Sequence, residues 1–126
     1  MTEYKYIPGV CNIGPAEIQK RRQIGILWSI VSIALFVILF LLNLPTWTRL
    51  FIFLPTIVAF SGWYQAIFHF CAGYGNKGLY NVAKSVGKSD TVEQAEFRKI
   101  DKKKAQQILT LSIVSAAIVS IILYFI

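Results

Sequence analysis

Few side chains in this chain are able to hold a cofactor or attack a substrate, and two of them stand near residue 70. His69 is the one histidine of the sequence, Cys71 follows two positions later, and Cys11 is the second cysteine. Positions i and i+2 of a helix point about 200° apart, so His69 and Cys71 are not expected to share an ion. A zinc site needs three or four ligands. We therefore predict no metal site.

His69 also ends a polar stripe. Ser61, Gln65 and His69 follow one another at i, i+4 and i+8, which is the spacing of one helix face. An ionisable residue inside a membrane span is by default a functional candidate. We treat these three residues as candidate contacts to a ligand or a partner protein. Haem or quinone binding at His69 is the alternative to a histidine that is simply packed, and no other cofactor is predicted.

Cys11 is a second candidate contact. Nearby cations lower the pKa of a thiol and make it a better nucleophile or redox sensor. A run of three cations begins at Lys20, nine residues further along the chain. No base is fixed beside Cys11 in the sequence, so a packed thiol is the competing interpretation.

Three apolar blocks make up half of the chain, and the second carries His69 and Cys71. Residues 24–42, 50–72 and 105–126 contain no Asp, Glu, Lys or Arg. At 1.5 Å per residue each block is about 28 Å long or more as a helix, which matches a hydrocarbon core of roughly 30 Å. The sequence therefore predicts an all-α integral membrane protein with three transmembrane helices.

The cations predict the orientation of these helices. All of them except Arg49 stand before the first block or between the second and the third. By the positive-inside rule the N-terminus is cytoplasmic and the C-terminus external, in a multi-pass protein of the cell membrane. The formal charge of +7 is thereby explained without nucleic-acid binding. The cations expected at lipid headgroups are Lys20, Arg21, Arg22, Lys102, Lys103 and Lys104.

The same boundaries divide the chain. We expect a cytoplasmic arm over 1–14, a helix over 15–42 that includes the first span, a short external loop over 43–49, and a second span over 50–72. A basic cytoplasmic loop over 73–104, helical from about residue 91, leads into the third span over 105–126.

Local signals mark two helix starts. Pro15 suits the first helical turn, with Gly14 as cap, and Glu17 stands four residues before Arg21 in the favourable orientation for an ion pair. Asp90 and Glu93 have the spacing of a capping box.

The spans have faces enriched in small residues. Small side chains let helices approach closely in lipid, and serine hydroxyls are able to bond across the interface. We expect these faces to pack together and to leave Phe60, Trp63, Ile67 and Phe70 toward lipid. The predicted packing residues are Gly25, Ser29, Ser32, Gly62, Ala66, Ser112, Ala116 and Ser120.

The sequence predicts a binding role, not catalysis. Its spans lack the carboxylate that proton- or ion-coupled transport normally uses, and no Ser/His/Asp set is evident. We expect a non-catalytic accessory or assembly subunit of a larger membrane complex, whose partners are the bilayer and other membrane subunits or further copies of itself. The alternatives are a homo-oligomeric pore or carrier, and a haem- or quinone-binding anchor that uses His69.

Overall fold

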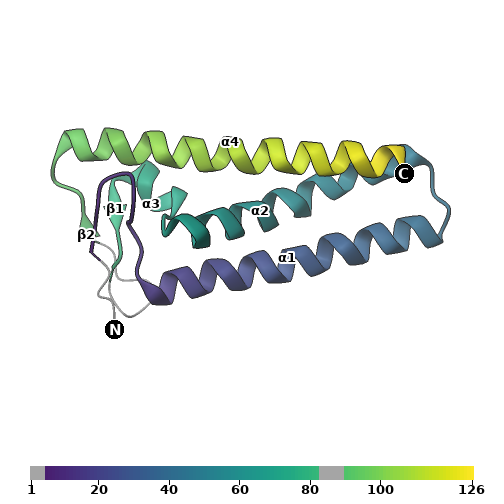
Figure 1. Cartoon of the computed structure of the whole chain (residues 1–126), viewed down its shortest axis with the longest axis horizontal. Helices are drawn as coiled ribbons and strands as arrows, with labels where there is room; N and C mark the ends of the chain where they lie inside the picture. The colour runs from purple at the N-terminus through teal and green to yellow at the C-terminus, as the bar shows by residue number, and fades with distance from the viewer. Residues whose placement is uncertain (1–4, 83–89) are drawn as a thin grey trace.

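Three long helical segments run side by side and meet a small folded head at one end (Figure 1). The structure, a computed structural model, describes residues 5–82 and 90–126. The segments are α1 (Pro15–Leu41), a 3-10 helix η1 (Thr46–Ile52) that continues into α2 (Phe53–Phe68), and α4 (Ala95–Phe125). Each of the three is long and apolar enough to cross a membrane.

The start of α1 follows the local sequence signals. Gly14 is the N-cap in an extended conformation, Pro15 opens the helix, and Glu17 lies in its first turn. Glu17 and Arg21 form the predicted ion pair, with Oε2 and Nη1 3.1 Å apart. Both predictions are confirmed, because they depend on contacts within one helical turn or two.

The second apolar block is not one continuous α-helix. It begins as η1, and Pro55 lies in the first turn of α2, where its missing N–H costs no helical hydrogen bond. The expected helix end at residue 72 is wrong. His69 takes a left-handed conformation with φ of 54° and ψ of 41°, and its N–H bonds to the carbonyl of Gln65, so α2 ends at Phe68.

The head contains the short elements. These are α3 (Ala72–Lys77) and an antiparallel pair of strands, β1 (Leu79–Tyr80) and β2 (Asp90–Thr91), with Leu79 opposite Thr91. The capping box at Asp90 is wrong: this residue is paired in β2, and α4 begins at Ala95 after the N-cap Gln94. Residues 1–4 of the expected arm and 83–89 of the expected loop lie outside the described residues.

α1 and α2 touch most closely at two glycines. A Cβ on Gly62 would lie 2.7 Å from the backbone nitrogen of Gly25 and 2.8 Å from the carbonyl oxygen of Arg21. The indole ring of Trp63, also on α2, covers Gly25 at 3.0 Å from an added Cβ. Any side chain at residue 62 would therefore push the two helix backbones apart.

α2 lies between α1 and α4 and packs on both (Figure 1). Ser112, Ala116 and Ser120 form a buried stripe along α4, and the Tyr64 hydroxyl of α2 lies 2.6 Å from the hydroxyl of Ser115. The small residues of the third apolar block thus lie inside the packed chain.

The expectation that Phe60, Trp63, Ile67 and Phe70 of the second apolar block face lipid is wrong for two of them. Phe70 is fully buried in a cluster with Ala105 and Ile108. Trp63 donates from its indole nitrogen to the Ser29 hydroxyl at 3.0 Å. Ile67 is 65% exposed, as expected. The large aromatic rings fill the space beside the small residues of the neighbouring helices.

At the end opposite the head, Arg49 of η1 joins the first two apolar segments to the third. Its side chain is buried, and its Nη1 donates to the carbonyl of Leu123 at 3.1 Å, in the last turn of α4. The guanidinium carbon lies 5.9 Å from the ring centre of Phe36 and 5.7 Å from that of Phe40. Arg49 therefore satisfies an end carbonyl of α4 while it packs on α1.

Candidate functional site

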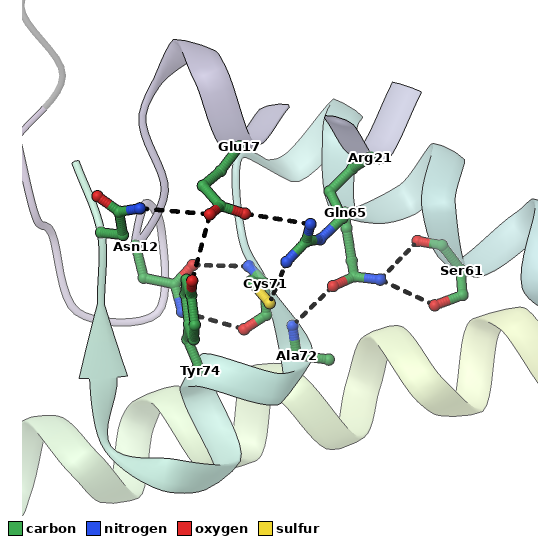
Figure 2. A network of polar contacts seen from close by, with 9 residues as sticks. Asn12, Glu17, Arg21, Ser61, Gln65, Cys71, Ala72 and Tyr74 are labelled. Atoms are coloured by element: carbon green, nitrogen blue, oxygen red, sulfur yellow. Dashed lines mark hydrogen bonds and ion pairs between the residues drawn. The ribbon is translucent and has the colours of Figure 1, made fainter. Parts of the chain in front are cut away.

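A network of buried and half-buried polar side chains joins the head to α1 and α2 (Figure 2). It lies where the N-terminal arm, the start of α1, the end of α2 and the beginning of α3 meet. Its centre is Glu17, whose side chain is 1% exposed. We call this set the head network; its members are Asn12, Glu17, Arg21, Ser61, Gln65, Cys71, Tyr74 and Asn81.

The Glu17 carboxylate is held from both sides. Its Oε1 accepts from the Tyr74 hydroxyl at 3.2 Å and from Nδ2 of Asn81 at 3.3 Å, while Oε2 faces Arg21. A buried carboxylate needs such a neutralising partner to remain in place. Burial, together with the charge of Glu17, raises the pKa of Tyr74.

Arg21 points into the protein and not toward lipid headgroups. Its side chain is 13% exposed, and Nη2 donates to the sulfur of Cys71 at 3.0 Å (Figure 2). Lys104 also departs from the headgroup expectation, with Nζ 4.3 Å from the ring centre of Phe68. Both cations find partners inside the fold because a carboxylate, a thiol or an aromatic face comes within reach. The remaining cations expected at headgroups are exposed, namely Lys20, Arg22, Lys102 and Lys103.

Asn12 fixes the arm to the end of α2, and sequence reasoning missed it. The residue is fully buried. Its backbone N–H donates to the carbonyl of His69 at 3.1 Å, and its backbone carbonyl accepts from Asn81 at 2.8 Å. Residues 11–14 of the arm are therefore a buried, hydrogen-bonded part of the head and not a free tail.

The stripe of Ser61, Gln65 and His69 is broken at its last member. Nε2 of Gln65 donates to the Ser61 carbonyl at 3.1 Å and to its hydroxyl at 2.9 Å, and Oε1 accepts from the N–H of Ala72 at 3.0 Å. Gln65 therefore bridges the end of α2 and the start of α3. His69 is half-buried beyond the helix end, where its left-handed backbone removes it from the face of Ser61 and Gln65.

Cys11 lacks the environment of an activated nucleophile. It is 8% exposed, and its thiol lies 3.4 Å from the carbonyl of Ile13. Burial raises the pKa of Cys11, which is opposite to the direction that the cation argument predicts. Cys11 and Cys71 are both free thiols.

A second buried carboxylate, Asp101, anchors the outer part of the arm. It is fully buried, accepts from the backbone N–H of Gly9 at 2.7 Å, and accepts a hydrogen bond from the Tyr6 hydroxyl. Burial and the neighbouring Asp101 raise the pKa of Tyr6. The one sequence signal for this role is an acid standing alone among the cations of residues 98–104.

The arrangement offers no gathered ligand set for a metal within residues 5–82 and 90–126. No three His, Cys, Asp or Glu side chains come together in this part of the chain. Glu17 and Asp101 instead bind groups of the protein itself. The head network thus acts as a structural connection between segments that are distant in sequence.

A groove of about 370 Å³ lies along the helices beyond the head network. Its hydroxyl groups bond within their own helices: Ser32 donates to the carbonyl of Trp28 at 2.7 Å and Thr56 donates to that of Ile52 at 2.6 Å. The walls that remain are apolar. We call it the helix groove; it is lined by Ser29, Ser32, Ile33, Phe36, Ile52, Thr56, Ala59, Phe60, Trp63, Val119 and Leu123.

No protein-family model, no curated protein and no solved structure matches this chain.

Proposed function

We propose that the chain is a non-catalytic accessory or assembly subunit of a larger membrane complex and that a transmembrane helix of a partner subunit packs into its helix groove. The groove carries this proposal. Residues from α1, η1, α2 and α4 contribute to its walls, so it is a concave surface that exists only when the chain is folded.

Physical chemistry favours a helix as the occupant. Inside lipid, association is driven by close packing, because lipid tails are as apolar as the side chains they would replace. A concave, apolar surface gives a helix side chain more contacts than a convex one. The hydroxyls of Ser32 and Thr56 are satisfied within their own helices, so an apolar partner leaves no unpaired polar group.

The head supports a binding role in place of catalysis. Glu17 is paired with Arg21, and Asp101 is bonded to Tyr6 and Gly9. These carboxylates hold the arm and α1 in place. We place the head in the cytoplasm and the C-terminus outside, because the cations gather at the head end of the apolar segments.

A matched pair of substitutions on α1 tests the groove. Ile33 lines it and is 65% exposed, whereas Ile38 is 53% exposed and about 140° further around the helix. The protein is purified from its native membrane in mild detergent, and the polypeptides present in fixed stoichiometry are identified. We expect Ile33→Trp to release a foreign subunit that wild type and Ile38→Trp retain.

Two results would overturn the accessory role. A particle that contains this chain alone, at the mass of several copies, would favour a homo-oligomeric pore or carrier. Equal retention of the foreign subunit by Ile33→Trp and Ile38→Trp would place the interface elsewhere on the chain.

The aromatic lining of the groove supports one second candidate, a quinone-binding anchor. Phe36, Phe60 and Trp63 offer faces on which a flat ring stacks. His69, the residue expected to bind such a ligand, does not line the groove. A short-chain quinone is added and quenching of tryptophan fluorescence is measured. Quenching that is lost in Trp63→Phe and kept in Trp47→Phe would support this candidate. Equal quenching in all three proteins would oppose it.

A further inference from the structure

The head carries a second pocket, of about 360 Å³, between α3 and the first turns of α4. Four cationic side chains line it: Lys77 at the end of α3, and Arg98, Lys99 and Lys102 on α4. The three on α4 stand at i, i+1 and i+4, and together with Ala95 they occupy one side of the helix. We call this the basic pocket.

The charges of the basic pocket are not balanced by its own lining, which contains no carboxylate. Of the acids near these cations in the sequence, Asp101 is fully buried and bonds to Tyr6 and Gly9. Glu93 and Glu96 are exposed and do not line the pocket. Like charges that converge on one concave surface repel each other unless an anion joins them. The pocket is therefore complementary to a ligand with several negative oxygens.

One of the cations is held in position. Nη1 of Arg98 donates to the carbonyls of Val92 at 2.7 Å and Glu93 at 2.8 Å, which fixes the plane of the guanidinium. The aliphatic part of Arg98 lies over Gly78, whose left-handed φ is +70° and where an added Cβ would meet Cδ of Arg98 at 2.8 Å. A guanidinium that is already oriented loses little freedom when it binds a phosphate in two-pronged fashion.

The beginning of α4 adds to the positive potential. Ala95, the first residue of this helix, lines the pocket, and the N-cap Gln94 makes no side-chain cap hydrogen bond. The positive end of the dipole of a 31-residue helix therefore lies at the pocket.

The depth of the pocket in the bilayer indicates where the anion comes from. The apolar part of α4 begins at Ala105, so Lys102 stands about 5 Å and Arg98 about 10 Å before it along the helix axis. The headgroup region on each side of a bilayer is about 5–7 Å thick. Lys102 is thus at headgroup level once the apolar segments are inserted, and Arg98 lies a few ångströms beyond it on the aqueous side.

We propose that the basic pocket binds the phosphate-bearing headgroup of an anionic phospholipid in the leaflet on the head side. The proposal rests on the membrane insertion of the proposed function, but it does not depend on the helix groove or on any partner subunit. It predicts selectivity for negatively charged headgroups at one defined place, beyond the general attraction between a basic protein and an anionic surface.

The test uses the full chain in nanodiscs of neutral phosphatidylcholine doped with phosphatidylglycerol or cardiolipin. After the protein is washed into detergent, mass spectrometry counts the lipids that it retains. We expect retained anionic lipid in wild type and about tenfold less in Lys99→Gln/Lys102→Gln, because each cation near the surface contributes appreciably to binding. Both positions are exposed, so the fold is expected to persist, and circular dichroism checks this.

A control variant removes the same charge elsewhere. Lys20→Gln/Lys103→Gln changes two exposed cations that do not line the pocket, and we expect it to retain anionic lipid within twofold of wild type. An equal loss in both double variants would show general surface attraction and would overturn the proposal.

Two further results distinguish a bound lipid from a soluble ligand and from a failure of membrane insertion. The first is displacement of the lipid by a low concentration of inorganic phosphate or soluble glycerol phosphate. This result would identify the ligand as a soluble phosphate compound and would overturn the lipid assignment. A chain that fails to enter nanodiscs would overturn both this proposal and the membrane function. An inserted chain without preferential retention would overturn this proposal alone.

Discussion

The side-chain amide of Asn12 hydrogen-bonds both backbone groups of Cys71, a residue 59 positions further along the chain. Nδ2 donates to the Cys71 carbonyl at 3.1 Å, and Oδ1 accepts from the Cys71 N–H at 2.6 Å. Cys71 comes just after the left-handed turn at His69, where helical pairing has stopped. Asn12 thus gives the Cys71 N–H the partner that a continued α2 would have provided, while the Cys71 carbonyl also accepts from the N–H of Gly75 in α3 at 2.9 Å.

Replacing Asn12 by leucine keeps the approximate volume and removes both hydrogen bonds. Each buried backbone group that loses its partner costs about 1–3 kcal/mol. The Cys71 N–H loses its partner, whereas the Cys71 carbonyl keeps the N–H of Gly75. We therefore expect Asn12→Leu to lower the free energy of unfolding in detergent by about 1–3 kcal/mol, measured by denaturant titration. Asn76→Leu is the control, because Asn76 is exposed on α3. Similar losses in both variants would contradict the structural role of Asn12.

Substitutions of the buried pair Glu17 and Arg21 are expected to have non-additive effects on the free energy of unfolding. Glu17→Gln or Arg21→Gln leaves one charge buried without its counter-ion, which costs about 3–5 kcal/mol. The double variant should cost less than the sum of the two, because no uncompensated charge remains. Arg22→Gln, at an exposed neighbour, serves as the control. Additive losses would show that the two side chains act independently.

The contact between Gly62 and Gly25 predicts a large effect of a single methyl group. Gly62→Ala places a Cβ 2.7 Å from backbone, and the resulting shift should cost about 1–3 kcal/mol of stability. At Gly73 the nearest atom to an added Cβ is the Cys71 sulfur at 3.7 Å, so Gly73→Ala should be neutral or slightly stabilising. The midpoints of thermal unfolding of the two variants are measured in parallel. Equal midpoints would mean that α1 and α2 cross less tightly than described.

The buried Cys11 should react slowly and should make stability fall with rising pH. Because burial raises the pKa of its thiol, the folded state favours the protonated form. The stability that the folded state gains from the protonated thiol is fully present below the pKa of an unfolded cysteine, about 8.5. It is lost as pH rises through the higher pKa of the folded state. We expect alkylation of Cys11 by iodoacetamide to be at least about tenfold slower in the folded chain than in denaturant. Peptide mapping by mass spectrometry separates Cys11 from Cys71, and equal rates in both states would refute the burial of Cys11.

Arg49 should matter to the end of α4. Arg49→Met keeps much of the apolar contact with Phe36 and removes the hydrogen bond to the Leu123 carbonyl. We expect a loss of about 1–3 kcal/mol and faster amide exchange in the last two turns of α4. Lys20→Met, an exposed cation at the head end, should leave that exchange unchanged.

The parts of the fold that depend on nearby residues could be predicted from the sequence. The three apolar segments, the start of α1 at Pro15 and the pair of Glu17 with Arg21 all follow from composition and from spacings of a few residues. The small residues at Gly25 and Gly62 also lie where helices touch.

The head could not be predicted in this way. The end of α2 at His69 depends on a hydrogen bond from the arm, and the buried position of Asp101 depends on Tyr6 and Gly9. The spacing to Glu17 singles out Arg21 from its exposed neighbour Arg22, but the hydrogen bond that turns Arg21 toward Cys71 joins residues 50 positions apart. Contacts between residues so far apart leave no periodic signal in the chain.

The bond between Gly9 and Asp101 spans 92 residues and sets the order of events during synthesis. A ribosome adds about 5–20 residues per second, so the arm waits roughly 5–20 seconds for the residue that completes it. During this interval two apolar helices have left the ribosome, and the arm does not yet have Asp101 to bind. The head therefore closes after the last helix begins to emerge, and a nascent chain that stalls earlier presents an open N-terminal arm.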